Sequence, residues 1–455
     1  MTIDLPADFV FGVAGSAAKI EGAGDADGRT ASVWDAFADA PGRIVDGSRP
    51  AIAADHYHRM TTDVDLLADL GVQAYRFSVS WSRVQPGGSG PVNPAGIEFY
   101  DRLVDRLLDN DIAPWLTLHH WDLPVELMLQ GGWLERDTVD RFADYVTVVA
   151  GRLADRVAAW ITVTEPGPHT FHGHAVGIDA PGLTMLGAAF AAGHHQLLAH
   201  ARAVGVLRAT APASMVGIVN HHCTVDPASD DPADRRAAEL FHALHNLQYS
   251  GPVLAGCYPD PSTALPGTDL SVIADGDLAE IAAPLDFYGV NYDHPRTIAA
   301  APDNRSIPFT MTVPPDHPIT ASGWPVHPAG LTRTLTELHE CYPRLPPLYV
   351  TENGAAYTDP SVTEAHSGNS GPARDDERIA FLDGHLAAVV DARTAGVDVR
   401  GYFYGALLDG WEWTDGFTRP FGLVRVQRDT LERQPRASFW HYASIIAAIR
   451  NASAR

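Results

Sequence analysis

The chain has 455 residues, of which 45% are hydrophobic and 19% are charged, and its formal net charge is −24. This composition supports a large hydrophobic core and argues against a disordered chain. The negative charge argues against nucleic acid as a partner, because binding a polyanion requires clustered Lys and Arg side chains.

The cysteines and the first residues indicate a cellular location. Cys223, Cys257 and Cys341 contain no C-x-x-C pair, and an odd number argues against a disulfide framework. Residues 1–6 show neither the basic start nor the apolar segment of a secretory signal. No window approaches about 18 uninterrupted apolar residues, so we expect no membrane span and no membrane partner. We therefore expect a cytoplasmic protein.

Short apolar runs rich in β-forming residues alternate with helical patterns along the chain. The predicted strands are residues 9–14, 74–80, 114–119, 160–164, 215–220, 287–291, 348–352 and 401–407. The predicted helices between them include residues 62–70, 96–110, 138–157, 185–210, 331–341 and 377–395. Strands that alternate with helices predict a parallel sheet, and eight such units are enough to close a (β/α)8 barrel.

We therefore predict an α/β fold, a TIM barrel formed as a single domain over residues 1–455. Pro- and Gly-rich stretches predict long loops, of which residues 302–328 and 358–374 are the longest. Loops of this length are often functional, so we expect them at the catalytic face of the barrel.

Two glutamates follow predicted buried strands directly. Glu165 lies in the segment Thr-Val-Thr-Glu-Pro, and Glu352 lies in Val-Thr-Glu-Asn-Gly. In a barrel of parallel strands, the carboxyl ends of the strands form the catalytic rim. Two carboxyl groups on one rim are the catalytic groups that most glycoside hydrolases use.

A series of motifs surrounds these glutamates in a fixed order. The motifs occupy residues 9–12, 20–23, 32–35, 55–59, 75–78, 120–124, 323–324, 408–413 and 421–423. In this order they resemble glycoside hydrolase family 1, the β-glucosidase family, over nearly the whole chain. The resemblance implies a retaining glycosidase that acts through a covalent glycosyl-enzyme intermediate, with a small glycoside as substrate.

The resemblance also implies the roles of the catalytic groups. Glu352 attacks the anomeric carbon, and Glu165 protonates the departing oxygen and later deprotonates the attacking water. In retaining enzymes these two carboxyl groups lie about 5–5.5 Å apart. Arg76 resembles the family's partner of the nucleophile, and a guanidinium beside Glu352 favours its ionised form. The alternative for either glutamate is a structural ion pair at a strand end.

Further residues resemble the sugar-binding groups of the family. We expect hydroxyl binding or stacking from His120, Glu412 and Trp413, and an aromatic platform for the leaving group from Trp324. A plain packing role is the alternative for each. We expect no metal and no cofactor, because the first predicted strand supplies no ligand to accompany the histidines. The full predicted substrate-binding set is Lys19, His120, Trp121, Thr164, Asn291, Asp293, Trp324, Glu412 and Trp413.

Four positions depart from the family pattern. Lys19 stands where the family usually has glutamine, Thr164 replaces an asparagine, Asp293 replaces a tyrosine and Gly405 replaces a tryptophan. Thr164 has a shorter reach, which weakens a contact with the sugar 2-hydroxyl, and contacts of that kind supply several kcal/mol in the transition state.

The other three departures carry expectations of their own. Lys19 is expected to pair with Glu412, because buried charges usually pair. Asp293 adds a carboxylate near Glu352, so we expect it to be protonated, paired with Lys19 or Arg76, or available to a cationic substrate group. Gly405 removes a large ring, and we expect Trp411 to refill part of that space.

Three functional hypotheses follow. The first is a retaining β-glycosidase or transglycosidase for a modified sugar, either 2-deoxy or amino. The second is an ordinary broad-specificity β-glucosidase that tolerates the substitutions. The third is a barrel that binds sugar without hydrolysing it, since fold does not imply function. The leaving group, the choice between hydrolysis and transfer, and the oligomeric state stay open.

Overall fold

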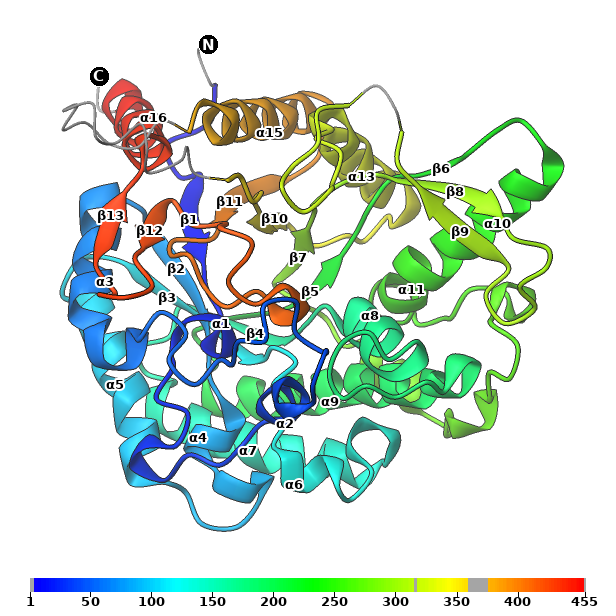
Figure 1. The fold of residues 1–455 in the computed structure, drawn as a ribbon, viewed down its shortest axis with the longest axis horizontal. Coiled ribbons are helices and arrows are strands. Elements are labelled where there is room, and N and C mark those ends of the chain that lie inside the picture. Colours follow the sequence, from blue (N-terminus) through cyan, green and yellow to red (C-terminus); the bar gives the residue numbers. More distant parts are fainter. Residues whose placement is uncertain (1–3, 315–316, 359–374, 454–455) are drawn as a thin grey trace.

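Eight parallel strands close into a barrel (Figure 1). The structure is a computed structural model, and it describes residues 4–314, 317–358 and 375–453. Around the barrel the strands follow the order β1-β11-β10-β7-β5-β4-β3-β2. Their bounds are β1 Val10–Ala14, β2 Ala74–Ser78, β3 Ala113–His119, β4 Ala159–Thr164, β5 Met215–His221, β7 Phe287–Asn291, β10 Leu348–Asn353 and β11 Val399–Gly405. The predicted (β/α)8 barrel is confirmed, and each predicted strand overlaps one of these eight.

Large apolar side chains fill the interior of the barrel near the start of the strands. The Trp115 ring lies 5.0 Å from Phe287, 4.8 Å from Tyr349 and 4.9 Å from Phe403, between ring centroids. All four rings are buried. This packed layer leaves the opposite, carboxyl ends of the strands as the place where polar side chains meet.

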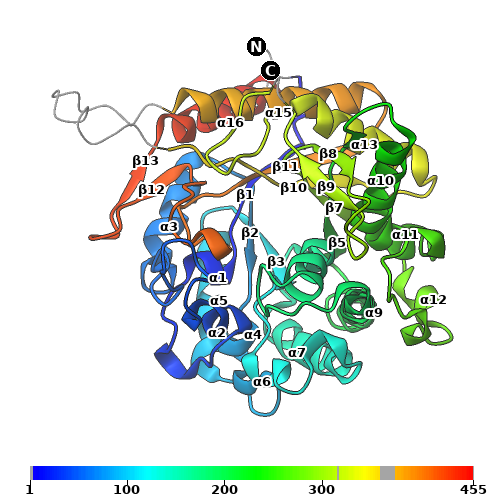
Figure 2. The same ribbon diagram turned by 45° about the vertical axis from the view of Figure 1, so that its right-hand side comes forward.

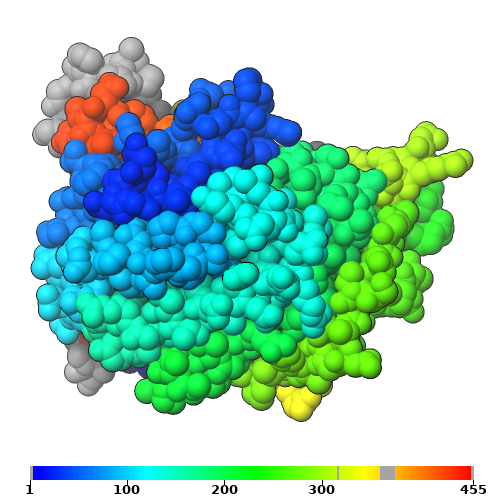
Figure 3. All heavy atoms as spheres, turned by 90° about the horizontal axis from the view of Figure 1, so that it is seen from below, coloured from blue at the N-terminus to red at the C-terminus, as the bar shows by residue number. Residues whose placement is uncertain are grey.

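Helices surround the strands, as Figure 2 shows. The long ones are α3 His56–Leu70, α5 Pro94–Leu108, α7 Asp137–Leu153, α9 Phe190–Thr210, α13 Pro328–Cys341, α15 Asp376–Thr394 and α16 Ala437–Ser453. Shorter helices are α1 Ala17–Ile20, α2 Val33–Asp39, α4 Trp81–Val84, α6 Val125–Met128, α8 Pro166–Pro168, α10 Pro232–His242, α11 Gln248–Ala255 and α12 Asp277–Ile281. Seen from below, residues of the first half of the chain, coloured blue to green, cover most of the surface (Figure 3).

The helix boundaries differ from the predictions where local backbone geometry intervenes. The helix predicted from residue 185 begins at Phe190, because Leu186 has a φ of 51° and cannot continue a right-handed helix. The helix predicted from residue 62 begins earlier, at His56, and the one predicted to residue 157 ends at Leu153.

Two small sheets lie outside the barrel. β12 (Val424–Val426) pairs with β13 (Arg433–Pro435), and β8 (Arg296–Ala300) lies between β6 (Val225–Pro227) and β9 (Phe309–Thr312). The prediction of a long loop over residues 302–328 is therefore wrong in part, because β9 lies inside it. Of the second predicted loop, residues 359–374 lie outside the described residues. No helix in the described ranges is both long and apolar enough to cross a membrane.

Candidate active site

A cavity of about 270 Å³ opens where the barrel strands end. Its lining includes both predicted catalytic glutamates, Glu165 from the end of β4 and Glu352 from β10. It also includes most of the predicted substrate-binding residues, namely Lys19, His120, Trp121, Asp293, Trp324, Glu412 and Trp413. The structure thus brings together on one rim side chains that are separated by up to several hundred positions in the sequence.

Arg76 lies beneath Glu352 and forms hydrogen bonds to it and to the backbone next to it. Its guanidinium is buried, with Nη1 3.0 Å from Oε2 of Glu352 and 2.9 Å from the carbonyl oxygen of Thr351. Burial lowers the pKa of Arg76, and the negative charge of Glu352 opposes that effect. The ion pair places a positive charge beside the carboxyl group that the family resemblance predicts to be the nucleophile.

Glu165 lies in a different environment. Its Oε1 accepts a hydrogen bond of 2.7 Å from Nδ2 of Asn291. The amide is oriented by its other side, because Oδ1 of Asn291 accepts from the hydroxyl of Thr351 at 2.8 Å. Burial raises the pKa of Glu165; the charge of His221 works against this rise, while Glu352 and Asp293 add to it. Retaining hydrolysis requires one protonated carboxyl group, the role predicted for Glu165, and one ionised carboxyl group, the role predicted for Glu352.

The expected pair between Lys19 and Glu412 forms, with Nζ 2.7 Å from Oε2. Burial works against the charge of Lys19, but Glu412, Glu352 and Glu165 together raise its pKa. Burial also raises the pKa of Glu412, and Lys19 opposes that rise. The two charges therefore stabilise each other in a largely enclosed site.

Aromatic rings form the walls of the cavity. Trp413 stacks on Trp121 with ring centroids 4.9 Å apart, and the ring of His120 lies 5.7 Å from Trp413. Burial holds the pKa of His120 well below its usual range, so this imidazole is neutral. Trp324 stacks on His294 at 4.9 Å. An indole face of this kind can cover the C–H face of a pyranose.

Three of the lining residues adopt the left-handed backbone region that favours glycine. The φ angles are 73° at Trp121, 52° at Glu165 and 52° at Trp413. Such conformations cost of order 1–3 kcal/mol each and cluster at functional sites, where the surrounding structure holds them. The strained backbone positions are therefore residues that the sequence predicts to be catalytic or substrate-binding.

Thr164 does not line the cavity. It is fully buried, and its hydroxyl accepts a 2.6 Å hydrogen bond from Nη2 of Arg76. Its carbonyl oxygen accepts from Nε1 of Trp121 at 3.1 Å. Arg76 and Asn291 are likewise absent from the lining and lie beneath it. These three residues contact the catalytic groups or their neighbours rather than the open cavity.

Of the three alternatives expected for Asp293, the pairing with Lys19 or Arg76 is wrong. Asp293 forms an ion pair with neither Lys19 nor Arg76; its Oδ2 lies 3.2 Å from Nε2 of His221. Nδ1 of His221 lies 2.8 Å from Nε2 of His245. Burial disfavours the charged imidazole, but Asp293 and Glu165 raise the pKa of His221 above its usual value.

Sequence reasoning missed His221 and His245, which both line the cavity. The signal for His221 was available, because it follows the predicted strand 215–220 just as Glu165 and Glu352 follow theirs. His245 carried no comparable signal, since it lies on the helical turn Ala243–Leu247 away from any strand end.

Gly405 also differs from expectation. A Cβ atom at this position would lie 2.7 Å from Cγ of Glu352, so Glu352 itself occupies the adjoining space. Trp411 does not refill the cavity: it is fully buried, and its Nε1 donates to the hydroxyl of Ser48 at 3.0 Å. The absent side chain thus lets Glu352 pack against the backbone of β11.

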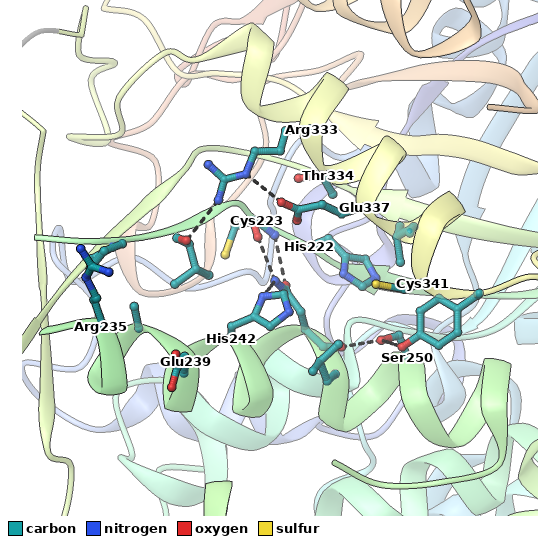
Figure 4. Close-up of a pocket in the computed structure, with 17 residues that line it drawn as sticks. His222, Cys223, Arg235, Glu239, His242, Ser250, Arg333, Thr334, Glu337 and Cys341 are labelled. Carbon is teal, nitrogen blue, oxygen red and sulfur yellow. Dashed lines mark hydrogen bonds and ion pairs between the residues drawn. The ribbon is translucent and has the colours of Figure 1, made fainter. Parts of the chain in front are cut away.

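A second cavity of about 380 Å³ lies outside the barrel, between α10, α11 and α13 (Figure 4). Its lining includes Cys223, His242 and Arg333, and none of the predicted site residues. Arg333 forms ion pairs of 2.8 Å with both Asp226 and Glu337. We find no group of three or more His, Cys, Asp or Glu side chains that could hold a metal ion among the described residues.

A protein-family model for glycosyl hydrolase family 1 matches residues 1–450. The chain belongs to this family. It is 38% identical over 444 residues to β-glucosidase A from Thermotoga maritima, covering 97% of each chain. Among solved structures it superposes on a psychrophilic β-glucosidase from Micrococcus antarcticus with a TM-score of 0.93 and 44% identity, covering 98% of both chains.

The family confirms the type of enzyme. Its members are retaining glycoside hydrolases, so the predicted enzyme class holds. Structures of the T. maritima β-glucosidase in complex with castanospermine and with deoxynojirimycin match with TM-scores of 0.91 and 36% identity, covering 98% of this chain and 99% of that chain.

Proposed function

We propose that this glycoside hydrolase is a retaining β-glycosidase or transglycosidase for a modified sugar, with Glu352 as nucleophile and Glu165 as acid/base. Glu352 forms the bond to the anomeric carbon while the glycosidic bond breaks, and Glu165 transfers its proton to the departing oxygen. Glu165 then takes a proton from water or an acceptor alcohol, whose oxygen displaces Glu352.

The observation that carries the modified-sugar part is the hydrogen bond between Thr164 and Arg76. Family members usually have an asparagine at position 164 that holds the 2-hydroxyl of the sugar. Here the hydroxyl of Thr164 is buried and engaged by Arg76 at 2.6 Å, and the residue does not line the cavity. A sugar without an ordinary 2-hydroxyl loses nothing at this position.

Of the two modified sugars, the pairing of Asp293 favours the 2-deoxy sugar. An amino sugar would need a free carboxylate, but Asp293 already lies 3.2 Å from His221 and is balanced by that charge. An ammonium group would therefore have to displace His221 before Asp293 could bind it.

An ordinary β-glucosidase is the second candidate. The named relatives are β-glucosidases at 36–44% identity, and one of them binds the small molecules castanospermine and deoxynojirimycin. This supports a small-molecule ligand for the cavity, and it favours glucose if the four substitutions are tolerated.

The test compares kcat/KM for 4-nitrophenyl β-glucoside, its 2-deoxy analogue and its 2-amino analogue. We expect the 2-deoxy substrate to be preferred after correction for spontaneous hydrolysis, with Glu352→Gln as the inactive control. Thr164→Asn should raise kcat/KM on the glucoside about tenfold, equal to about 1.4 kcal/mol of transition-state binding. Efficient turnover of the glucoside by the unaltered enzyme, with no preference for either analogue, would establish the ordinary β-glucosidase instead.

A further inference from the structure

We propose that the active-site cavity binds a leaving group that carries a carboxylate on an aromatic ring, and that Arg296 recognises this carboxylate. The region concerned is called the Arg296 end and consists of His172, His221, His245 and Arg296, all of which line the cavity. The inference rests on the proposed glycosidase function and adds the chemical class of the leaving group.

Arg296 has no counter-ion in the part of the chain that the structure describes. It is the first residue of β8 and is partly buried, and no Asp or Glu side chain in the described ranges forms an ion pair with it. Its Nε atom is buried without a hydrogen-bond partner. Its guanidinium acts to lower the pKa of the buried Cys223 thiol, to which it is hydrogen-bonded, and also the pKa of His221, His245 and His294, and none of these four is a carboxylate.

The other arginines near cavities are neutralised. Arg76 pairs with Glu352 at 3.0 Å. Arg333 pairs at 2.8 Å with Asp226 and with Glu337, and Figure 4 shows the pair with Glu337. Removing a guanidinium from water without a partner is costly. Because a guanidinium matches a carboxylate in a bidentate geometry, an unpaired one facing a substrate cavity is suited to an anionic substrate group.

The acids near the Arg296 end are already occupied. Asp293 pairs with His221 at 3.2 Å, and Asp179 lies 3.3 Å from Nδ1 of His172. Burial holds the pKa of His245 well below its usual range, so its ring is neutral. Arg296 therefore has no acid of its own among the described residues, and a single substrate carboxylate would balance its charge.

The walls beside Arg296 are apolar. A recess of about 30 Å³ shares Pro168, His172, His245 and Arg296 with the main cavity. Its remaining lining consists of Gly167, Phe171, Phe241, Leu244, Phe309 and Met311. The recess is too small for an aromatic ring, but a ring in the main cavity would border these apolar side chains while its acidic substituent meets the guanidinium.

The position of Arg296 also fits a glycoside, in which the sugar and the leaving group lie on opposite sides of the bond that is cleaved. Lys19 follows β1, whereas His221 ends β5, and these two strands stand opposite each other in the ring of eight. Lys19, paired with Glu412, therefore lies opposite His221 of the Arg296 end, and the proposed catalytic glutamates come from strands between these two sides. A sugar at one side places its leaving group at the other.

The experiment uses two β-glycosides of the same sugar, one with a 4-carboxyphenyl and one with a 4-carbamoylphenyl leaving group. The amide is the better leaving group, so chemistry alone favours it. We expect Arg296→Gln to lower the ratio of kcat/KM for the acid over the amide roughly tenfold to a hundredfold, mainly through KM. Arg296→Lys should retain part of the ratio, and Arg235→Gln, which alters an arginine of the outer cavity paired with Asp230, should leave it unchanged.

Binding of the released products separates this proposal from the glycosidase proposal. Calorimetry with 4-hydroxybenzoate and 4-hydroxybenzamide needs no turnover, so it reports on Arg296 even if no glycoside is cleaved. Tighter binding of the benzoate by at least about tenfold, lost in Arg296→Gln with an unchanged thermal unfolding temperature, supports the assignment. Equal binding of the two products, or a preference that survives in Arg296→Gln, overturns it.

Discussion

The two sides of the active-site cavity differ in whether a partly enclosed cationic side chain has an acidic partner. On one side Lys19 lies 2.7 Å from Glu412, so the two charges neutralise each other. On the other side Arg296 has no acidic partner among the described residues, and its Nε is an unsatisfied buried donor. A paired cation supports the architecture of a site, whereas an unpaired one costs stability and is retained for what it binds.

Between these two sides, the catalytic glutamates show a similar division. Glu352 has a cationic partner in Arg76, at 3.0 Å, while Glu165 accepts a hydrogen bond from the neutral amide of Asn291, at 2.7 Å. Burial raises the pKa of Glu165 against the opposing hydrogen bond from Asn291, whereas Glu352 has a guanidinium beside it, so the two carboxyl groups lie in different environments. The predictions below test these contrasts, beginning with the largest expected effect.

The largest expected effect comes from replacing Glu352, the proposed nucleophile. Glu352→Gln should lower kcat by about a thousandfold or more, because no covalent intermediate can form. An aryl 2-deoxy-2-fluoro-β-glucoside should label the unaltered enzyme at Glu352, detected by intact mass, and should not label the variant. Glu98→Gln, an exposed site on α5, is the matched control. Undiminished activity in Glu352→Gln would remove Glu352 from the mechanism.

Stability measurements test the contrast between Lys19 and Arg296. Lys19→Gln leaves Glu412 buried and unpaired, and breaking a buried pair costs about 3–5 kcal/mol of the free energy of unfolding. The side chains are only 15% and 6% exposed, so solvent screens this pair little. Arg296→Gln should cost less than about 1 kcal/mol, since no partner is stranded.

Urea denaturation of Lys19→Gln, Glu412→Gln and the double variant measures the coupling directly. The double variant should be more stable than the sum of the single losses predicts. Additive losses, or a larger loss in Arg296→Gln than in Lys19→Gln, would contradict the contrast.

The pH profile tests the pair of His221 and Asp293. The charge of His221 lowers the pKa of Glu165, and the charge of Asp293 raises it. His221→Gln removes the first effect and leaves Asp293 uncompensated, so both changes raise the pKa of Glu165.

Glu165 works as an acid only while it is protonated, so activity falls as pH rises through its pKa. The basic limb of kcat/KM should therefore move to higher pH in His221→Gln. His441→Gln, at a histidine paired with Asp383 on the outer helices, should leave the profile in place. A basic limb that stays in place or moves to lower pH in His221→Gln would show that His221 does not act on Glu165.

Local patterns in the sequence were sufficient for the barrel and for its two glutamates. Apolar strands alternating with helices predict parallel strands, and parallel strands gather their carboxyl ends at one rim. Glu165 and Glu352 follow such strands directly, so their shared location follows from topology. The family resemblance supplied the role of Arg76, which spacing alone does not give.

Only the tertiary structure decided which charges pair. Asp293 meets His221, 72 positions away, instead of the predicted Lys19 or Arg76. Thr164 of β4 is engaged by Arg76 of β2, and Arg296 has no acidic partner among the described residues. Pairing depends on distances of a few ångströms between side chains from separate strands, and those distances exist only once the barrel has closed.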